Sequence, residues 1–372
     1  MKALLIGHIG KGNFGDDFMT IALLRYLSNK YNNLELICLS SESIINLNKV
    51  KYKKESLNNI IKYIFLSDTV IVNGGNYLHD YSSNIRFKFS PFIKFGIVSI
   101  FTAIFKKKLI FTGQGFGPFS SNLAKMAFRL IFRNVDYISV RDKESLRLFK
   151  KIMPKNYHYK CKLTMDSTYF FYKNPGIFKS NKENTKPVIG VNLLPFYEKY
   201  FNDKKRDLAI IKELFDLIMT LIKTNKFSNN IIFCVFNRKK SESEKSLFKK
   251  LESMIREHEI VNVEYLVYED VESFIDRFSK IDFFIGMRLH GIILSQILGI
   301  QQINIAYHPK CINIAETIGI SHRRIIPINS FNAKNVNINF LIMDRADKFN
   351  LEKDLLRKVK LFEDNALPKK LF

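Results

Sequence analysis

The segment 286–291, which reads GMRLHG, carries the side chains best suited to chemistry in this sequence. An apolar strand leads into it and a helix is predicted from Gly291, so Arg288 and His290 stand just before a helix N-terminus. The free N–H groups and positive dipole of such an end attract anions. The guanidinium of Arg288 matches carboxylate or phosphate oxygens, and the imidazole of His290 can transfer a proton near neutral pH. A lone histidine is more often structural, but this pairing favours an anion site with a proton-transfer group.

Two further basic residues follow strands in the same way. Lys310 comes after the predicted strand Gln302–Ala306, and Arg141 comes after the predicted strand Tyr137–Val140. Parallel strands end at a common sheet edge, where open α/β sheets bind ligands. We therefore expect Lys310 on the same edge as Arg288, and Arg141 opposite them across a cleft.

A glycine-rich loop lies near the N-terminus, where residues 10–15 read GKGNFG. This G-x-G-x-x-G spacing is typical of dinucleotide-binding turns. However, Asp16 and Asp17 follow where a pyrophosphate would lie, and Glu35 sits too early in its strand to reach a ribose. We therefore expect no nicotinamide or flavin cofactor. The loop is predicted to present Asn13 and Asp16 or Asp17 to ligand hydroxyls, with a plain capped turn as the alternative.

Two more glycine loops end strands of the first half, NGG at 73–75 and TGQGFGP at 112–118. Glycines let backbone N–H groups approach a ligand closely, so Gly75 and Gln114 are candidate binding residues. Ordinary turn chemistry explains each loop equally well. The seven histidines are scattered and no metal-ligand spacing occurs, so no metal site is expected.

Short apolar runs alternate with helical stretches along the whole chain, which predicts parallel sheets covered on both faces. With 372 residues, and about 100–200 residues in a typical domain, two domains are expected. The polar stretch Lys173–Lys186 is the best linker. The expected fold class is α/β, with two doubly wound, Rossmann-like domains facing a cleft, at 1–175 and 186–345.

The formal net charge is +24, from 59 Lys and Arg against 35 Asp and Glu. Such an excess indicates an acidic partner, although an A+T-rich genome would also produce it. The basic residues form no recognisable nucleic-acid module, so no nucleic-acid partner is expected. The four cysteines include no C-x-x-C pair, as in reduced cytoplasmic proteins.

One stretch leaves two interpretations open. Arg86–Lys108 combines aromatic residues, an apolar centre and basic ends. It could lie in an anionic membrane interface or form a core helix with basic flanks. Its most apolar part, Phe95–Phe105, is shorter than the roughly 20 residues that a spanning helix needs.

In their order along the chain, GKGNFGDD, NGG, TGQGFGP, SVRDKES, DST, GMRLHG and YHPK resemble the polysaccharide pyruvyl transferase family, from Leu5 to Gly319. The resemblance implies a glycosyltransferase-B type fold, with the last helix, within 346–372, packing back on the first domain. It implies transfer of pyruvate from phosphoenolpyruvate to a sugar of a cell-surface polysaccharide or its precursor, as a cyclic ketal. One departure is His308, where an acidic residue is expected.

The family's basic and acid/base positions map onto Arg141, Arg288, His290 and Lys310. His290 would protonate C3 of phosphoenolpyruvate, while the three basic side chains and the helix N-terminus at Gly291 hold its anionic groups. The second domain would be the donor side. No metal or organic cofactor is expected, with phosphoenolpyruvate as co-substrate.

On the acceptor side, the first domain, Asp16 or Asp17 with Asn13 would orient or deprotonate the sugar hydroxyl. The acceptor could be lipid-linked, and the expected location is the cytoplasm or the inner membrane face. The alternatives are a glycosyltransferase that uses a nucleotide sugar and a non-catalytic glycan-binding scaffold. Arg288 and His290 argue against the scaffold.

Overall fold

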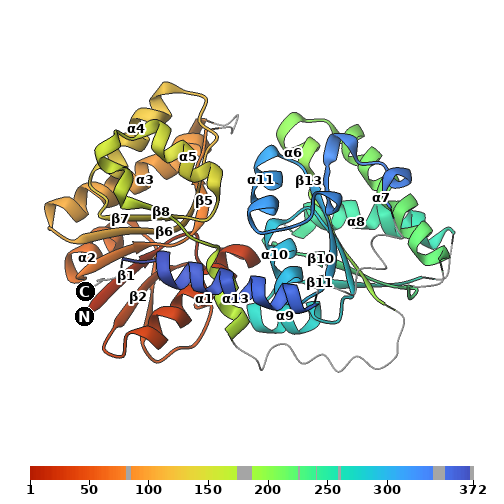
Figure 1. Ribbon diagram of the computed structural model, residues 1–372, viewed down its shortest axis with the longest axis horizontal. Helices are drawn as coiled ribbons and strands as arrows, with labels where there is room; N and C mark the ends of the chain where they lie inside the picture. Colours follow the sequence, from red (N-terminus) through yellow and green to blue (C-terminus); the bar gives the residue numbers. More distant parts are fainter. Residues whose placement is uncertain are drawn as a thin grey trace. The chain divides into compact units, whose positions relative to one another are not determined.

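The computed structural model describes residues 1–80, 85–173, 187–224, 227–239, 241–258, 261–337 and 348–368. The chain forms two compact α/β units (Figure 1). Unit 1 comprises residues 1–11, 16–171 and 357–372, and unit 2 comprises residues 12–15 and 172–356. The expected linker, apart from Lys173, lies outside the described residues.

Unit 1 is built on one parallel sheet with the strand order β3-β2-β1-β4-β6-β7-β8, in which β5 also pairs with β6. Its central strands are mostly apolar and almost wholly buried, because helices cover both faces of the sheet. The strands are β1 (Lys2–Ile6), β2 (Glu35–Ser40), β3 (Val50–Lys54), β4 (Thr69–Val72), β5 (Gly75–Leu78), β6 (Lys108–Phe116), β7 (Tyr137–Val140) and β8 (Cys161–Leu163).

Four helices cover one face of this sheet, and α1 covers the other, with the second half of α13 packed against it (Figure 1). The first four are α2 (Leu57–Leu66), α3 (Ile85–Ile104), α4 (Asn122–Arg133) and α5 (Lys143–Ile152); the others are α1 (Phe14–Lys30) and α13 (Lys348–Asn365). On the second face, the Phe362 ring of α13 lies 5.2 Å from the Tyr26 ring of α1.

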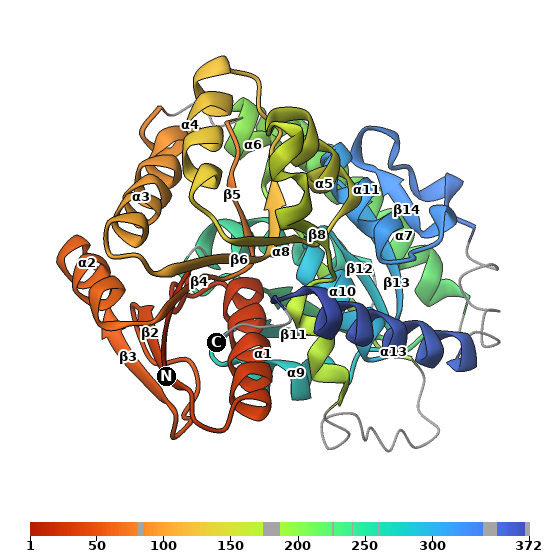
Figure 2. The same ribbon diagram turned by 60° about the vertical axis from the view of Figure 1, so that its left-hand side comes forward.

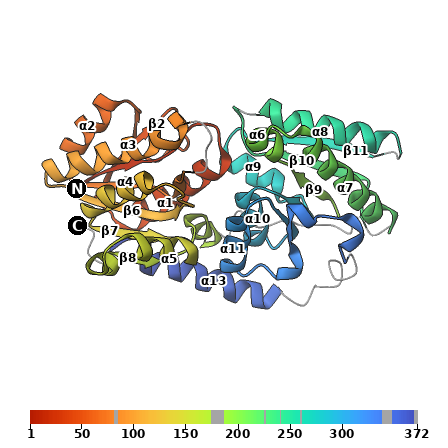
Figure 3. The ribbon, with the colours of Figure 1, turned by 90° about the horizontal axis from the view of Figure 1, so that it is seen from above.

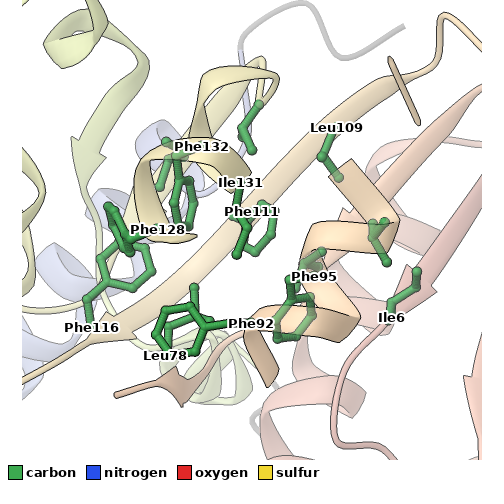
Figure 4. Packing of buried hydrophobic residues seen from close by; sticks show 14 of the residues in the cluster. Ile6, Leu78, Phe92, Phe95, Leu109, Phe111, Phe116, Phe128, Ile131 and Phe132 are labelled. Atoms are coloured by element: carbon green, nitrogen blue, oxygen red, sulfur yellow. The ribbon is translucent and has the colours of Figure 1, made fainter. Parts of the chain in front are cut away.

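The core under the four helices is rich in phenylalanine (Figure 4). Phe128 and Phe132 of α4 pack in edge-to-face contact with Phe116 of β6, with ring centroids 5.0 and 5.2 Å away from it. From α3, Phe92 and Phe95 are almost fully buried in the same cluster. Burying each such ring stabilises the fold by roughly 1.5–3 kcal/mol, so the inner side of the stretch 86–108 is a core helix.

Unit 2 holds a second parallel sheet with the order β11-β10-β9-β12-β13-β14; Figure 2 labels its strands β11, β12, β13 and β14. Its strands are β9 (Ile189–Asn192), β10 (Asn230–Val235), β11 (Asn262–Val267), β12 (Phe283–Gly286), β13 (Gln301–Ala306) and β14 (Ile325–Pro327). Its helices are α6 (Phe196–Phe201), α7 (Lys204–Lys223), α8 (Ser241–Arg256), α9 (Val271–Phe278), α10 (Leu289–Ile297) and α11 (Pro309–Thr317). Short 3-10 helices of the two units lie at 155–160, 167–173, 322–324, 328–330 and 333–335.

Four residues of the N-terminal glycine loop, Gly12–Gly15, belong to unit 2. The Phe14 N–H donates to the carbonyl of Phe236 at 2.9 Å, and the Arg238 N–H donates to the carbonyl of Gly12 at 2.8 Å. The fully buried Phe14 ring lies 4.6 Å from Phe274 and 5.4 Å from Phe236, between ring centroids. The loop is therefore anchored by an aromatic side chain in the core of unit 2.

Within the described residues, no helix combines the length and the apolar character needed to cross a bilayer.

Candidate active site

Each sheet reverses its winding at one point, and a polar cluster lies at the carboxyl end of the strands there, where open α/β sheets bind ligands. In unit 2 the reversal falls between β9 and β12. The Arg288 N–H, just after β12, donates to Oδ1 of Asn192, at the end of β9, at 3.1 Å. Asn192 is fully buried, so this bond holds the turn from β12 into α10 in place.

The Arg288 guanidinium is held by a buried carboxylate. Its Nη2 donates to Oε1 of Glu244, from the first turn of α8. The Glu244 side chain is 2% exposed and that of Arg288 is 23% exposed. The Nε of Arg288 is buried with no hydrogen-bond partner among the described residues. A buried donor without an acceptor costs about 1–3 kcal/mol, so this atom is suited to an anionic ligand.

His290 lies in the first turn of α10, against the backbone of the glycine loop. A Cβ built on Gly15 would stand 2.0 Å from Nδ1 of His290, so only glycine leaves room for this imidazole. Gly291 serves packing as well, since a Cβ there would lie 2.8 Å from the Phe284 ring. Its N–H donates to the Arg288 carbonyl at 3.0 Å. The side chain of Lys310, in α11, lies outside the described part of the structure.

In unit 1 the reversal falls between β1 and β4, and there a histidine meets a carboxylate. Nδ1 of His8 lies 3.1 Å from Oδ2 of Asp16, with side chains 47% and 14% exposed. The His8 N–H donates to the Tyr77 hydroxyl at 3.1 Å, which itself donates to the Gly74 carbonyl at 2.8 Å. Burial first, and then the Asp16 charge, raise the pKa of Tyr77 well above its usual value. Tyr77 therefore remains a neutral donor beneath His8.

Two neighbours shape this loop. Asp17 is buried and accepts the Gly10 N–H at 2.7 Å, which closes the glycine loop. Asn73, at the end of β4, donates through Nδ2 to the Thr20 hydroxyl at 2.7 Å. Its Oδ1 is a buried acceptor that has no hydrogen-bond partner in the part of the chain that the structure describes. Unit 1 thus holds an unpaired buried acceptor, Oδ1 of Asn73, after β4, the strand next to β1, which His8 follows.

Arg141 is paired inside unit 1. Its Nη1 donates to Oδ2 of Asp166 at 2.6 Å, and the two side chains are only 5% and 3% exposed. Nε of Arg141 is buried without an acceptor among the described residues.

The two candidate residues from the other glycine loops are packed into the same edge. Gln114 donates through Nε2 to the carbonyls of Val72, Asn73 and Thr112, so its amide ties strand ends together. At Gly75, a Cβ would lie 2.2 Å from the Tyr77 ring.

The sequence-predicted residues therefore fall into two clusters. Unit 2 gathers Arg288, His290, Gly291 and Asn13, and unit 1 gathers Asp16, Asp17, Gly75, Gln114 and Arg141. Asn13 forms an antiparallel bridge with Asn237. Over the described ranges, no group of three His, Cys, Asp or Glu side chains is placed to hold a metal ion.

Sequence reasoning missed four participants: Glu244, His8, Gly15 and the partner role of Asp166. Glu244 sits in a charged helix that carries no local signal, 44 residues from Arg288. His8 adjoins the glycine loop, so a search for a carboxylate near a loop histidine could have found it.

Comparison with known proteins agrees with the family resemblance. The family model described as polysaccharide pyruvyl transferase matches residues 13–309. No curated protein matches the sequence significantly.

Solved structures match nearly the whole chain in fold. The UDP-GlcNAc 2-epimerase from Methanocaldococcus jannaschii is 11% identical with a TM-score of 0.59, covering 98% of this chain and 100% of that one. Anabaena HepE, solved in complex with UDP and glucose, is 11% identical with a TM-score of 0.59, covering 97% and 94%. These matches confirm the fold class, two Rossmann-like α/β domains of the glycosyltransferase-B type.

Proposed function

The chain belongs to the polysaccharide pyruvyl transferase family, and from that premise we propose that it transfers pyruvate from phosphoenolpyruvate to a sugar of a bacterial cell-surface polysaccharide or its precursor. The product is a cyclic ketal. The observation that carries the proposal is the unit 2 cluster, in which a buried Arg288 Nε without an acceptor lies two residues from His290. Phosphoenolpyruvate brings a carboxylate and a phosphate, the two anions that a guanidinium binds best.

In the proposed reaction, His290 donates a proton to C3 of phosphoenolpyruvate, and positive charge develops at C2. One sugar hydroxyl adds to C2 and loses its proton to a base. Phosphate then leaves with the C2–O electron pair, and the second hydroxyl closes the ketal. Of the two protons lost by the sugar hydroxyls, one restores the proton that His290 gave to C3, and the other leaves on the phosphate. A general acid in this role contributes about 10²–10⁴-fold.

Three further groups have proposed roles, Glu244 and Lys310 in unit 2 and Arg141 in unit 1. Glu244 positions Arg288, because its buried carboxylate holds Nη2 and leaves Nε available. Lys310 and Arg141 are proposed to bind the anionic groups of the substrates. For Arg141 the support is its own buried, unpartnered Nε beside the Asp166 pair.

On the acceptor side we propose that His8 removes the hydroxyl proton and that Asp16 positions His8. The carboxylate of Asp16 faces Nδ1, so this nitrogen carries the hydrogen and Nε2 is left as the base. The backbone of His8 is held separately by Tyr77. Asp17 and Asn13 have structural roles in this proposal: Asp17 accepts the Gly10 N–H and so holds the glycine loop, and Asn13 bridges to Asn237.

Calorimetry tests the donor assignment, with phosphoenolpyruvate and UDP-sugars as parallel titrants. Phosphoenolpyruvate is expected to bind the wild type, more weakly Glu244→Gln, and not measurably Arg288→Ala. His290→Ala should still bind it but lose acceptor-dependent phosphate release. Binding of a UDP-sugar instead would support the alternative, a glycosyltransferase that uses a nucleotide sugar; HepE, which shares the fold, was solved with UDP and glucose.

A matched pair of variants tests the acceptor assignment. His8→Ala should lower kcat by about 10²–10⁴-fold with unchanged phosphoenolpyruvate binding, and free imidazole should restore part of it. Adding Asp16→Asn to the His8→Ala variant should lower kcat little further, because Asp16 acts through His8. The control is His322→Ala, which removes an exposed histidine 3.4 Å from the Glu316 carboxylate in unit 2. Normal turnover in His8→Ala would remove the base assignment alone, whereas no turnover in the wild type would remove the function.

A further inference from the structure

Large exposed apolar side chains are concentrated on one part of the molecule. Of the 15 among the described residues, 9 belong to α2, α3 and α4, three from each helix. They include Phe65 of α2, Ile100 and Ile104 of α3, and Met126 and Leu130 of α4, each 52–61% exposed. Contiguous apolar surface of this kind marks an interaction site rather than a random scatter.

The three helices form one layer of unit 1, which we call the α2–α4 face. They lie side by side, α2 against α3 and α3 against α4 (Figures 2 and 3). All three bury their inner sides in the same core, through residues such as Ile64, Phe95 and Phe128. Their exposed apolar side chains therefore point away from the sheet, on the outer side of the layer.

The charge of this face has a single sign. None of the three helices contains Asp or Glu. Lys62 of α2 and Arg129 and Arg133 of α4 are exposed, and so is Lys106, two residues after the end of α3. In contrast, α8 of unit 2 carries acidic and basic residues together. An apolar surface with basic residues and no acidic ones suits the interface of an anionic bilayer.

Acidic residues near the ends of the helices are already engaged. Asp68, just after α2, accepts the Lys2 N–H at 2.8 Å, and Asp136, shortly after α4, accepts the Leu109 N–H at 2.8 Å. Each of them directly precedes a strand, β4 and β7, so neither stands on the three helices. A second copy of the chain is a poor occupant, because pairing two such faces would bring basic residues together.

We propose that the α2–α4 face docks on a membrane surface with anionic headgroups. The apolar side chains enter the headgroup boundary while the basic ones contact the lipid phosphates. This inference is independent of the reaction proposed above and does not need the helices to span the bilayer. The sequence left two interpretations of Arg86–Lys108 open, a membrane-interface segment and a core helix. The proposal combines them and extends them to three helices, whose inner sides pack in the core and whose outer sides contact lipid.

Vesicle co-sedimentation tests the proposal with the full chain. The protein is expected to bind vesicles of phosphatidylcholine with phosphatidylglycerol at low salt, to bind phosphatidylcholine alone much more weakly, and to dissociate at high salt. The double variant Ile104→Glu with Leu130→Glu should weaken binding at least tenfold. Both positions are about 60% exposed, so the variant should unfold at an unchanged temperature, which circular dichroism checks.

The control also replaces two exposed apolar side chains by glutamate, but on unit 2: Phe201→Glu with Leu356→Glu, at positions 65% and 49% exposed. It adds the same charge and is expected to bind nearly as well as the wild type. Equal binding by the two double variants would overturn the proposal, since the net charge alone would then account for it. Absence of binding to the anionic vesicles at low salt would also overturn the proposal. That result is the one expected if the face binds an acidic protein instead of a membrane.

Discussion

The contact between Gly15 and His290 allows the active-site assignment to be tested without touching a titratable group. A methyl group added at Gly15 would stand 2.0 Å from Nδ1 of His290. Ordinary contact begins near 3.4 Å, so the imidazole has to retreat by about 1.4 Å. A displacement of roughly 1 Å at a reacting group can cost about 10²-fold in rate, and we expect Gly15→Ala to lower kcat by about that factor.

The backbone of Gly15 itself accommodates alanine. Gly15 lies in the first turn of α1, and its φ is not in the left-handed region. Alanine is the better helix former, by up to about 1 kcal/mol. The matched control is Gly96→Ala in α3, where an added Cβ meets nothing within 4 Å. We expect the control to keep full activity and to gain about 0.5–1 kcal/mol of unfolding free energy.

The assay is acceptor-dependent phosphate release, with phosphoenolpyruvate affinity and urea unfolding measured on the same preparations. The reasoning predicts a loss confined to kcat in Gly15→Ala, with phosphoenolpyruvate affinity unchanged and the protein still folded in the absence of urea. Full activity in Gly15→Ala would refute the role assigned to His290. A loss of activity that simply follows a loss of stability would refute the steric argument.

Two further predictions concern stability. Phe14→Ala should lower the free energy of unfolding by about 3–5 kcal/mol, because the ring is fully buried against Phe274. The control is Phe201→Ala, which removes an exposed ring, and urea titration measures the unfolding free energy of both variants. At Asp80, burial is the largest influence and raises the pKa, but hydrogen bonds from Ser121 and Ser120 lower it below its usual value. The ionised Asp80 therefore stabilises the fold above its unfolded-state pKa, and this stabilisation is lost as the pH falls through its lower folded-state pKa. In Asp80→Asn the free energy of unfolding should consequently fall less steeply below about pH 4. An unchanged dependence of the unfolding free energy on pH would contradict this.

The sequence was sufficient for most of the fold because buried parallel strands are nearly continuous apolar runs. The strand predicted before the NGG loop is β4, and the apolar strand predicted before GMRLHG is β12. The edge strand β3, Val50–Lys54, was not predicted, because it is mostly exposed and reads VKYKK. Edge strands need no apolar pattern, so periodicity gives no signal for them.

By itself the sequence indicated the candidate chemistry: an arginine and a histidine where a strand passes into a helix, and a glycine loop followed by two carboxylates. These depend on residues adjacent in the chain, whose geometry local rules predict. Only the tertiary structure decided their partners, such as Glu244 on Arg288, His8 on Asp16 and Gly15 under His290. It also decided which sides of α2, α3 and α4 remain exposed. Such pairings arise from packing between segments far apart in sequence, and a pattern along the chain carries no information about which distant side chain fills a given space.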